Sequence, residues 1–184
     1  AGSDNSARYI DYYFKNSQRI IRNNRRSIAI LDGTETELEL ELLGADVFSY
    51  FGLGCRNVSK LFLPKGYDLN KLFNGFYSYK NIIEHKKYAN NYVYNKSVFL
   101  IGRHQLIENG FILLKEESSL LSPVAMLYYE FYEEISEVDR FVYKNKEKIQ
   151  CVISKKDTAF GNSQKPHLWD YADGIDTINF LKDI

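Results

Sequence analysis

Cys55 is the side chain in this sequence best suited to covalent chemistry. It lies in residues 51–56 (FGLGCR), where glycines permit tight backbone geometry and a close approach of substrate. A cysteine reacts as the thiolate, and positive charge from Arg56 and Lys60 would favour that form. The alternative is a buried cysteine that acts as a small apolar side chain, and the spacing alone leaves both interpretations open.

The second cysteine and the three histidines are weaker candidates. Cys151 lies in an apolar run (IQCVI) that predicts a strand, where a structural role is favoured. His85, His104 and His167 lack the spacing and the cysteine partners of a zinc site, so we predict no metal centre. A dyad between Cys55 and His104 or His167 stays open, because such partners need only be close in space.

Gly2 and Ser3 form the other candidate site. They precede a run with helical spacing, and the free amides at a helix start bind phosphate. Ordinary helix capping needs the same residue types, and no Walker motif or complete dinucleotide fingerprint accompanies them. By themselves, Gly2 and Ser3 therefore do not distinguish a phosphate-binding turn from an ordinary helix cap.

The elements that must position these side chains alternate between strands and helices. We predict strands over 27–31, 58–63, 111–114, 124–131 and 149–153, and helices over 4–17, 34–51, 68–79, 88–101, 136–146 and 177–181. Such alternation predicts an α/β architecture with a mostly parallel sheet. In the second helix, Thr34 and Glu37 suit a capping box. Its inner side is predicted to carry Leu38, Leu42, Ala45, Phe48 and Tyr50.

Composition narrows the function classes. Of 184 residues, 45% are hydrophobic and 15% aromatic, which excludes a disordered chain. The 24 Lys and Arg balance 24 Asp and Glu, so the basic excess typical of nucleic-acid-binding domains is missing. No apolar run approaches the roughly 20 residues that span a bilayer. Two cysteines and no secretory leader favour free thiols and the cytoplasm.

Four stretches carry a resemblance to a known family: residues 1–9, 47–60, 64–68 and 169–174. Together they resemble the aldehyde dehydrogenase superfamily, in its acyl-CoA reductase branch, which is related to the bacterial luminescence reductase and includes Bacteroides-type proteins. The resemblance covers nearly the whole chain, and the stretch around Cys55 is its most specific part.

The resemblance implies a three-layer, aldehyde-dehydrogenase-like catalytic domain with a mostly parallel sheet. Residues 1–25 would end the cofactor-binding portion, with Gly2 and Ser3 beside the cofactor, and residues 26–184 would form the catalytic thiol domain. Cys55 would be the nucleophile, and its backbone N–H would donate to the oxyanion. NADPH or NADH would be bound mainly by a domain that this chain lacks, and no metal is expected.

The implied activity is reduction of a fatty acyl-CoA thioester to an aldehyde through an acyl-cysteine on Cys55. Hydrolytic members have a glutamate base before the cysteine, whereas residues 21–27 (IRNNRRS) hold no carboxylate. A second departure is Leu53, where Gln is common. Two alternatives stay open: a reductase of acyl-carrier-protein thioesters, and an inactive assembly domain. The resemblance also implies that the domain can form a homodimer.

Overall fold

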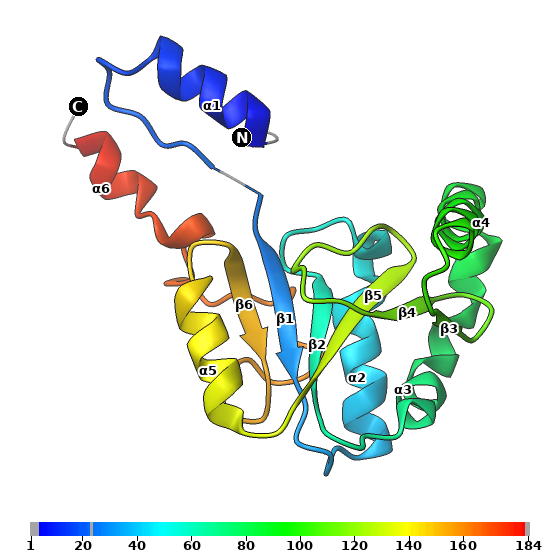
Figure 1. Ribbon diagram of the computed structural model, residues 1–184. Coiled ribbons are helices and arrows are strands. Elements are labelled where there is room, and N and C mark those ends of the chain that lie inside the picture. Colours follow the sequence, from blue (N-terminus) through cyan, green and yellow to red (C-terminus); the bar gives the residue numbers. More distant parts are fainter. Residues whose placement is uncertain (1–3, 23, 183–184) are drawn as a thin grey trace.

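A computed structural model describes residues 4–22 and 24–182 of the chain. Its centre is a six-stranded sheet in the order β3-β4-β5-β2-β1-β6 (Figure 1). The strands are β1 (Arg26–Ile30), β2 (Val58–Pro64), β3 (Ile107–Glu108), β4 (Leu113–Glu116), β5 (Met126–Tyr132) and β6 (Ile149–Ile153). Five strands run parallel, and β3 alone pairs antiparallel, with β4. The parallel strands therefore begin at one edge of the sheet, the amino edge, and end at the other.

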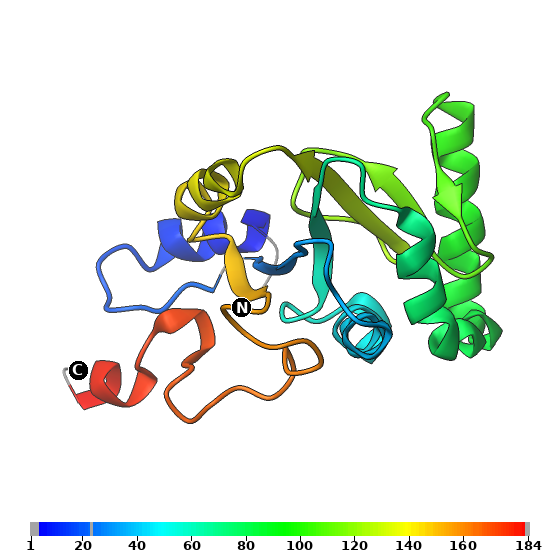
Figure 2. The ribbon, with the colours of Figure 1, turned by 90° about the horizontal axis from the view of Figure 1, so that it is seen from below.

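Helices cover both faces of the sheet. They are α1 (Asp4–Tyr13), α2 (Glu37–Phe48), α3 (Leu69–Phe76), α4 (Lys86–Ile101), α5 (Ile135–Lys144) and α6 (Thr177–Lys182), with 3₁₀ helices at Ser49–Gly52, Tyr77–Glu84 and Ala172–Gly174. Helices α2 and α3 share one apolar cluster with the sheet, whereas α5 packs in a different cluster on the opposite face (Figure 2). The predicted α/β class and its mostly parallel sheet are confirmed.

The central strands are apolar throughout because both of their faces are covered. In β1, Ile28 packs with α5 while its neighbour Ala29 packs with α2 and α3. In β2, Leu61 packs with α2 and α3, and its neighbour Phe62 packs with α5. All four side chains are almost inaccessible to solvent. Continuous apolar runs of this kind are typical of parallel strands buried on two faces.

Helix α2 differs from its prediction at its start and on its inner side. The cap is Thr36 with Glu39 as its box partner, because the Thr34 hydroxyl instead donates to Asp32 in the preceding turn, at 2.7 Å. Of the predicted inner side, Phe48 is buried, whereas Leu38, Leu42 and Tyr50 are exposed. The side chains that face the sheet are Leu40, Leu43, Val47 and Phe48. Both stripes have helical spacing, so only packing against the strands could choose between them.

Other boundaries moved by a few residues. Helix α1 ends at Tyr13 rather than at residue 17, and β4 begins at Leu113 rather than at residue 111. Strand β3 is two residues long and was not predicted, since so short a strand leaves no periodic signal. Within the described ranges, no helix combines the length and apolar character that crossing a membrane requires.

Candidate functional site

Cys55 is exposed and lies just before β2, at the amino edge of the sheet. The chain reaches it from α2 through a connection with three successive left-handed residues, Tyr50 (φ 50°), Phe51 (φ 59°) and Gly52 (φ 73°). For the two aromatic residues this conformation costs on the order of 1–3 kcal/mol each, so the surrounding structure must enforce it. Strain of this kind is concentrated at functional sites.

Asn57 holds the turn from inside. It is buried, and its side-chain oxygen accepts the Gly54 N–H at 2.9 Å. Its amide nitrogen donates to the carbonyls of Asp46 at 2.9 Å and Ser49 at 2.8 Å. A Cβ on Gly54 would lie 2.8 Å from the Asn57 oxygen, so the turn requires glycine at that position. Cys55 therefore sits on a fixed backbone.

Ser27 on β1 connects the turn to the sheet. Its hydroxyl donates to the Cys55 carbonyl at 3.0 Å and lies 2.9 Å from the sulfur of Cys151. The register of β1 shifts against β2 between Ser27 and Ile28, and against β6 between Arg26 and Ile28. Irregularities of this type re-aim side chains next to active sites. Here they let one hydroxyl reach both cysteines.

Two arginines flank Cys55. The Arg26 guanidinium donates to the carbonyls of Leu53 and Gly54, each at 3.1 Å. Burial lowers the pKa of Arg26, and the negative charge of the Cys55 thiolate opposes that effect. Arg56 donates to the Ser163 carbonyl and lies 3.8 Å from the Asp170 carboxylate. Arg26 was not among the predicted site residues, since its proximity depends on two distant strands meeting.

Lys60 does not assist the thiol. Its side chain is fully buried on the α5 face, and its ammonium group lies 2.6 Å from the Glu130 carboxylate. It also donates to the carbonyls of Glu117 and Ser118. The expectation that Lys60 charges the Cys55 environment is therefore corrected: Arg26 takes that position, because the turn before β2 brings its carbonyls to the guanidinium.

Cys151 has the structural setting that its sequence predicted. It is partly buried in β6, and burial raises the pKa of its thiol, while the hydrogen bond with Ser27 lowers it.

The histidines pack against aromatic rings: His85 on Phe51, His104 on Phe99 and His167 on Trp169. These contacts give no support to a cysteine–histidine dyad. The described part of the chain holds no cluster of three or more metal-ligating side chains, and the predicted Gly2 and Ser3 lie outside the described residues.

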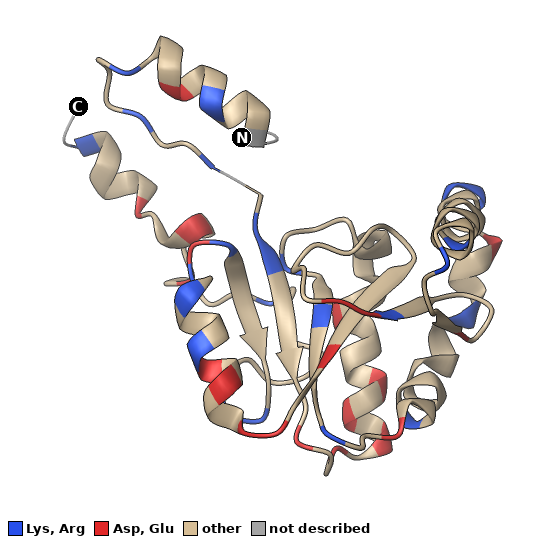
Figure 3. Cartoon of the chain, viewed as in Figure 1, with Lys and Arg blue, Asp and Glu red and all other residues tan. Residues whose placement is uncertain are grey.

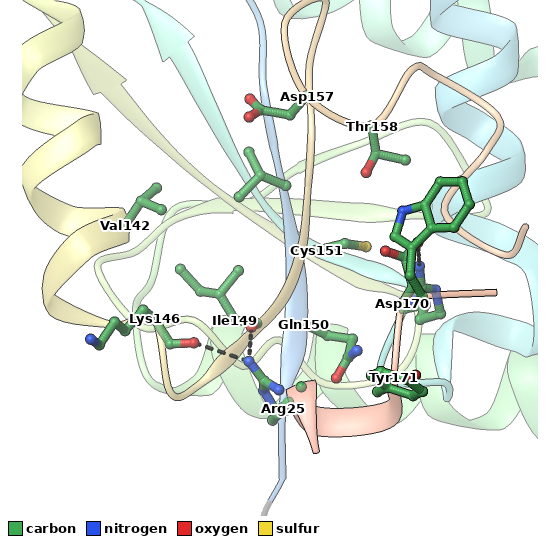
Figure 4. Close-up of a pocket in the computed structure, with 14 residues that line it drawn as sticks. Arg25, Val142, Lys146, Ile149, Gln150, Cys151, Asp157, Thr158, Asp170 and Tyr171 are labelled. Atoms are coloured by element: carbon green, nitrogen blue, oxygen red, sulfur yellow. Dashed lines mark hydrogen bonds and ion pairs between the residues drawn. The ribbon is translucent and has the colours of Figure 1, made fainter. Parts of the chain in front are cut away.

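A cavity of about 580 Å³ opens beside this turn (Figure 4). Arg56 and Cys151 are part of its wall, as are Arg25, Gln150, Trp169 and Tyr171. Because Arg56 follows Cys55 directly and Cys151 shares the Ser27 hydroxyl with it, the cavity and the exposed thiol belong to one region of the amino edge.

Comparison with known proteins then identifies the fold. No family model matches the chain, and no curated protein does. Among solved structures, an indole-3-acetaldehyde dehydrogenase mutant of P. syringae, in complex with NAD+ and IAA, aligns with a TM-score of 0.55 and 11% identity over 76% of this chain. An indole-3-acetaldehyde dehydrogenase in complex with NAD+ aligns with a TM-score of 0.56 and 11% identity over 83% of this chain.

The chain has an aldehyde-dehydrogenase-like fold. It spans 36% and 38% of the length of those two proteins, so it corresponds to a part of such a structure. At this identity the likeness concerns the fold alone. It is consistent with the resemblance seen in the sequence and does not reach the acyl-CoA reductase branch.

The turns after β1 and β2 do not offer the amides of Gly33, Thr34 and Asn70 to the pyrophosphate of a nicotinamide dinucleotide. Such sites use free amides in the turns at the carboxyl edge of a parallel sheet. In the turn after β1, Asp32 accepts the Thr34 N–H at 2.8 Å, and Glu35 accepts the Gly33 N–H at 3.1 Å. After β2, Asp68 accepts the Asn70 N–H. Figure 3 shows acidic residues at this edge, near the start of α2, and basic residues along the segment that leads into β1.

Proposed function

We propose that this chain supplies the acyl-accepting thiol of an acyl-CoA reductase, an aldehyde-dehydrogenase-like oxidoreductase. The observation that carries the proposal is the setting of Cys55: an exposed cysteine on a strained, internally bonded turn whose carbonyls bind the Arg26 guanidinium. A surface cysteine without a role would need neither the strained backbone nor the hydrogen bonds that hold this turn. The fold and the resemblance around residues 47–60 favour the same conclusion.

The acyl transfer follows from the residues of the chain. The Cys55 thiolate attacks the carbonyl carbon of the thioester, a C–S bond forms, and the carbonyl electrons move to oxygen. The backbone N–H of Cys55 is the donor that this proposal assigns to the oxyanion. When the carbonyl re-forms, the bond to the coenzyme A sulfur breaks, and that thiolate leaves and takes a proton from water. The product is an acyl-cysteine on Cys55.

The surroundings of Cys55 suit an acyl-cysteine that is protected from hydrolysis. Residues 21–27 contain no carboxylate that could activate water. Asp46, buried below the turn, accepts the N–H groups of Gly161 at 2.7 Å and Ser163 at 2.9 Å, so both of its oxygens are engaged. Conversion to an aldehyde requires hydride from NADPH or NADH. In this proposal residues 26–184 are the catalytic thiol domain, residues 1–25 end a cofactor portion, and the cofactor is held mainly outside this chain.

The test is the intact mass of the protein after incubation with palmitoyl-CoA. The chain has two cysteines, so Cys55→Ala and Cys151→Ala form a matched pair. We expect one acyl adduct on the parent and on Cys151→Ala, released by neutral hydroxylamine, and none on Cys55→Ala. An adduct that persists in Cys55→Ala, or no adduct on any form, contradicts the proposal. A parallel incubation with a palmitoylated acyl-carrier protein distinguishes the two thioester substrates.

One observation favours the alternative of an assembly domain. Helix α4 exposes the apolar side chains Val93, Tyr94, Val98 and Ile101, the last with 83% of its surface accessible. Exposed apolar patches mark protein interfaces. If palmitoyl-CoA leaves no adduct while the mass in solution rises with concentration, and Val98→Lys abolishes that rise, the assembly role replaces the enzymatic one.

A further inference from the structure

The cavity beside Cys55 has the size of a small-molecule site. It lies between β6, the end of α5 and the segment that precedes α6 (Figure 4). Its volume of about 580 Å³ falls within the roughly 300–1,000 Å³ typical of ligand pockets. Acyl transfer to Cys55 uses the sulfur and the turn but leaves this cavity without a role.

The charged groups in its wall favour an anion. Three cationic side chains, Arg25, Arg56 and Lys146, line it together with two carboxylates, Asp157 and Asp170, and a third carboxylate, Asp173, lies against Arg25. The arginine ion pairs are long, 3.7 Å from Arg25 to Asp173 and 3.8 Å from Arg56 to Asp170. Direct charge-assisted hydrogen bonds are about 1 Å shorter. The close partners of both guanidinium groups are neutral carbonyls, those of Lys146 and Ile149 for Arg25 and that of Ser163 for Arg56. Their positive charges are therefore balanced only by long ion pairs, and a phosphate would add a close anionic partner.

The remaining wall suits a planar ring with a hydrogen-bond donor. Trp169 and Tyr171 are exposed, and the Trp169 ring already stacks on His167 with a centroid distance of 4.8 Å and a tilt of 9°. A stacked pair is a firm platform for a nucleobase. The Gln150 side-chain oxygen is buried and has no hydrogen-bond partner among the described residues. It could accept from the exocyclic amine of adenine.

We propose that this cavity binds the 3′-phosphoadenosine diphosphate group of coenzyme A, with the phosphates near Arg25, Arg56 and Lys146 and the adenine near Trp169. The inference rests on the proposed function, because it names how the acyl donor is held while its thioester reaches Cys55. An acyl chain alone has neither phosphates for the arginines nor a ring for the aromatic platform. The position of Arg56, directly after Cys55, joins the two parts of the site.

The single tryptophan of the chain reports on this cavity. We would titrate 3′-phosphoadenosine 5′-diphosphate and follow the fluorescence of Trp169, with calorimetry as the independent readout. The proposal expects saturable quenching and binding heat, both lost at high salt. NAD+ and NADP+ provide the competing adenine nucleotides. Binding of these at least as tight as that of the coenzyme A nucleotide assigns the cavity to a dinucleotide and overturns the proposal.

Substitutions locate the binding. Trp169→Ala and Lys146→Gln change exposed side chains, so neither should unfold the protein. Each should weaken nucleotide binding by about tenfold in calorimetry, by loss of stacking or of charge. Arg140→Met, an exposed cation on α5 outside the cavity, is the matched control and should bind like the parent. Equal affinity in all three variants places the nucleotide elsewhere and overturns the proposal.

The two proposals fail separately. If Cys55 is acylated by palmitoyl-CoA at the same rate in Trp169→Ala and in the parent, and the nucleotide shows no heat of binding, the cavity proposal is wrong and the acyl transfer stands. If no adduct forms on Cys55 but the nucleotide still binds in competition with coenzyme A, the proposed function fails and the cavity remains a nucleotide site.

Discussion

The two cysteines of this chain lie on either side of one hydroxyl group, that of Ser27, yet they differ in exposure to solvent and in the backbone that carries them. Cys55 is exposed on a strained turn whose carbonyls bind the Arg26 guanidinium. Cys151 is partly buried in β6, where desolvation raises the pKa of its thiol. A residue type therefore says little by itself. The backbone that carries it and the water around it decide whether it reacts.

The largest expected difference is in alkylation of the native protein. Iodoacetamide at pH 7.5 should modify Cys55 about a hundredfold faster than Cys151, since the latter is shielded and remains the neutral thiol. Peptide mass mapping after timed quenching measures both rates in one sample. Equal alkylation rates in the native protein would show that the fold does not distinguish the reactivity of Cys55 from that of Cys151. Equal rates in 6 M guanidinium chloride are the control, because unfolding removes both environments.

The turn that exposes Cys55 depends on Asn57. Asn57→Ala removes four hydrogen bonds to backbone groups and should lower the free energy of unfolding by about 2–4 kcal/mol. Urea unfolding followed by fluorescence measures it. Asn74→Ala on the exposed side of α3 is the control and should change it by less than about 0.5 kcal/mol. A loss as small as the control's would show that the turn is held by something other than Asn57.

Substitutions of Arg26 and of Lys60 show which of these two cations affects the reactivity of Cys55. Arg26→Met should slow alkylation of Cys55 at pH 7.5 by about tenfold, because a nearby positive charge is lost. Lys60→Met should leave that rate unchanged, since the Lys60 ammonium group is matched by Glu130 on the other face. The opposite pattern would restore Lys60 to the site. Circular dichroism of both variants shows whether either effect comes from loss of the fold.

The smallest expected effect concerns Ser27 and Cys151. The Ser27 hydrogen bond lowers the pKa of Cys151, whereas burial raises it. Ser27→Ala should therefore raise that pKa further and slow alkylation of Cys151 by about threefold at a fixed pH. Since the thiolate fraction grows about tenfold per pH unit below the pKa, the Cys151 rate should still climb steeply at pH 8. A rate that is already flat at pH 8 would contradict the assignment.

Much of the fold could be predicted from local patterns. The apolar run at Ile28 and Ala29 predicted a strand buried on both faces, and Ile149–Ile153 matched its strand to the residue. The face of α2 could not be predicted, because two apolar stripes on one helix satisfy the same periodicity. Sequence periodicity sets the type of element, and contact with the sheet selects the buried side.

One part of the candidate site could be predicted from the sequence, and another part could not. Glycines around Cys55 predicted a turn before a strand, and the structure has it. Arg26 escaped prediction because it lies 29 positions from Cys55 in the numbering. Its guanidinium meets the turn only when β1 pairs with β2. No local signal encodes that meeting.

The sequence by itself determined which chemistry is available: one cysteine in a glycine-containing turn, no carboxylate base in residues 21–27, and apolar runs suited to a parallel sheet. The tertiary structure decided which charges serve the thiol, which side of α2 is buried, and that a cavity with arginines and a tryptophan opens beside Cys55. The physical reason is the distance along the chain over which each interaction acts. Backbone preference and periodicity act over a few residues, whereas electrostatics and burial depend on segments that only folding brings together.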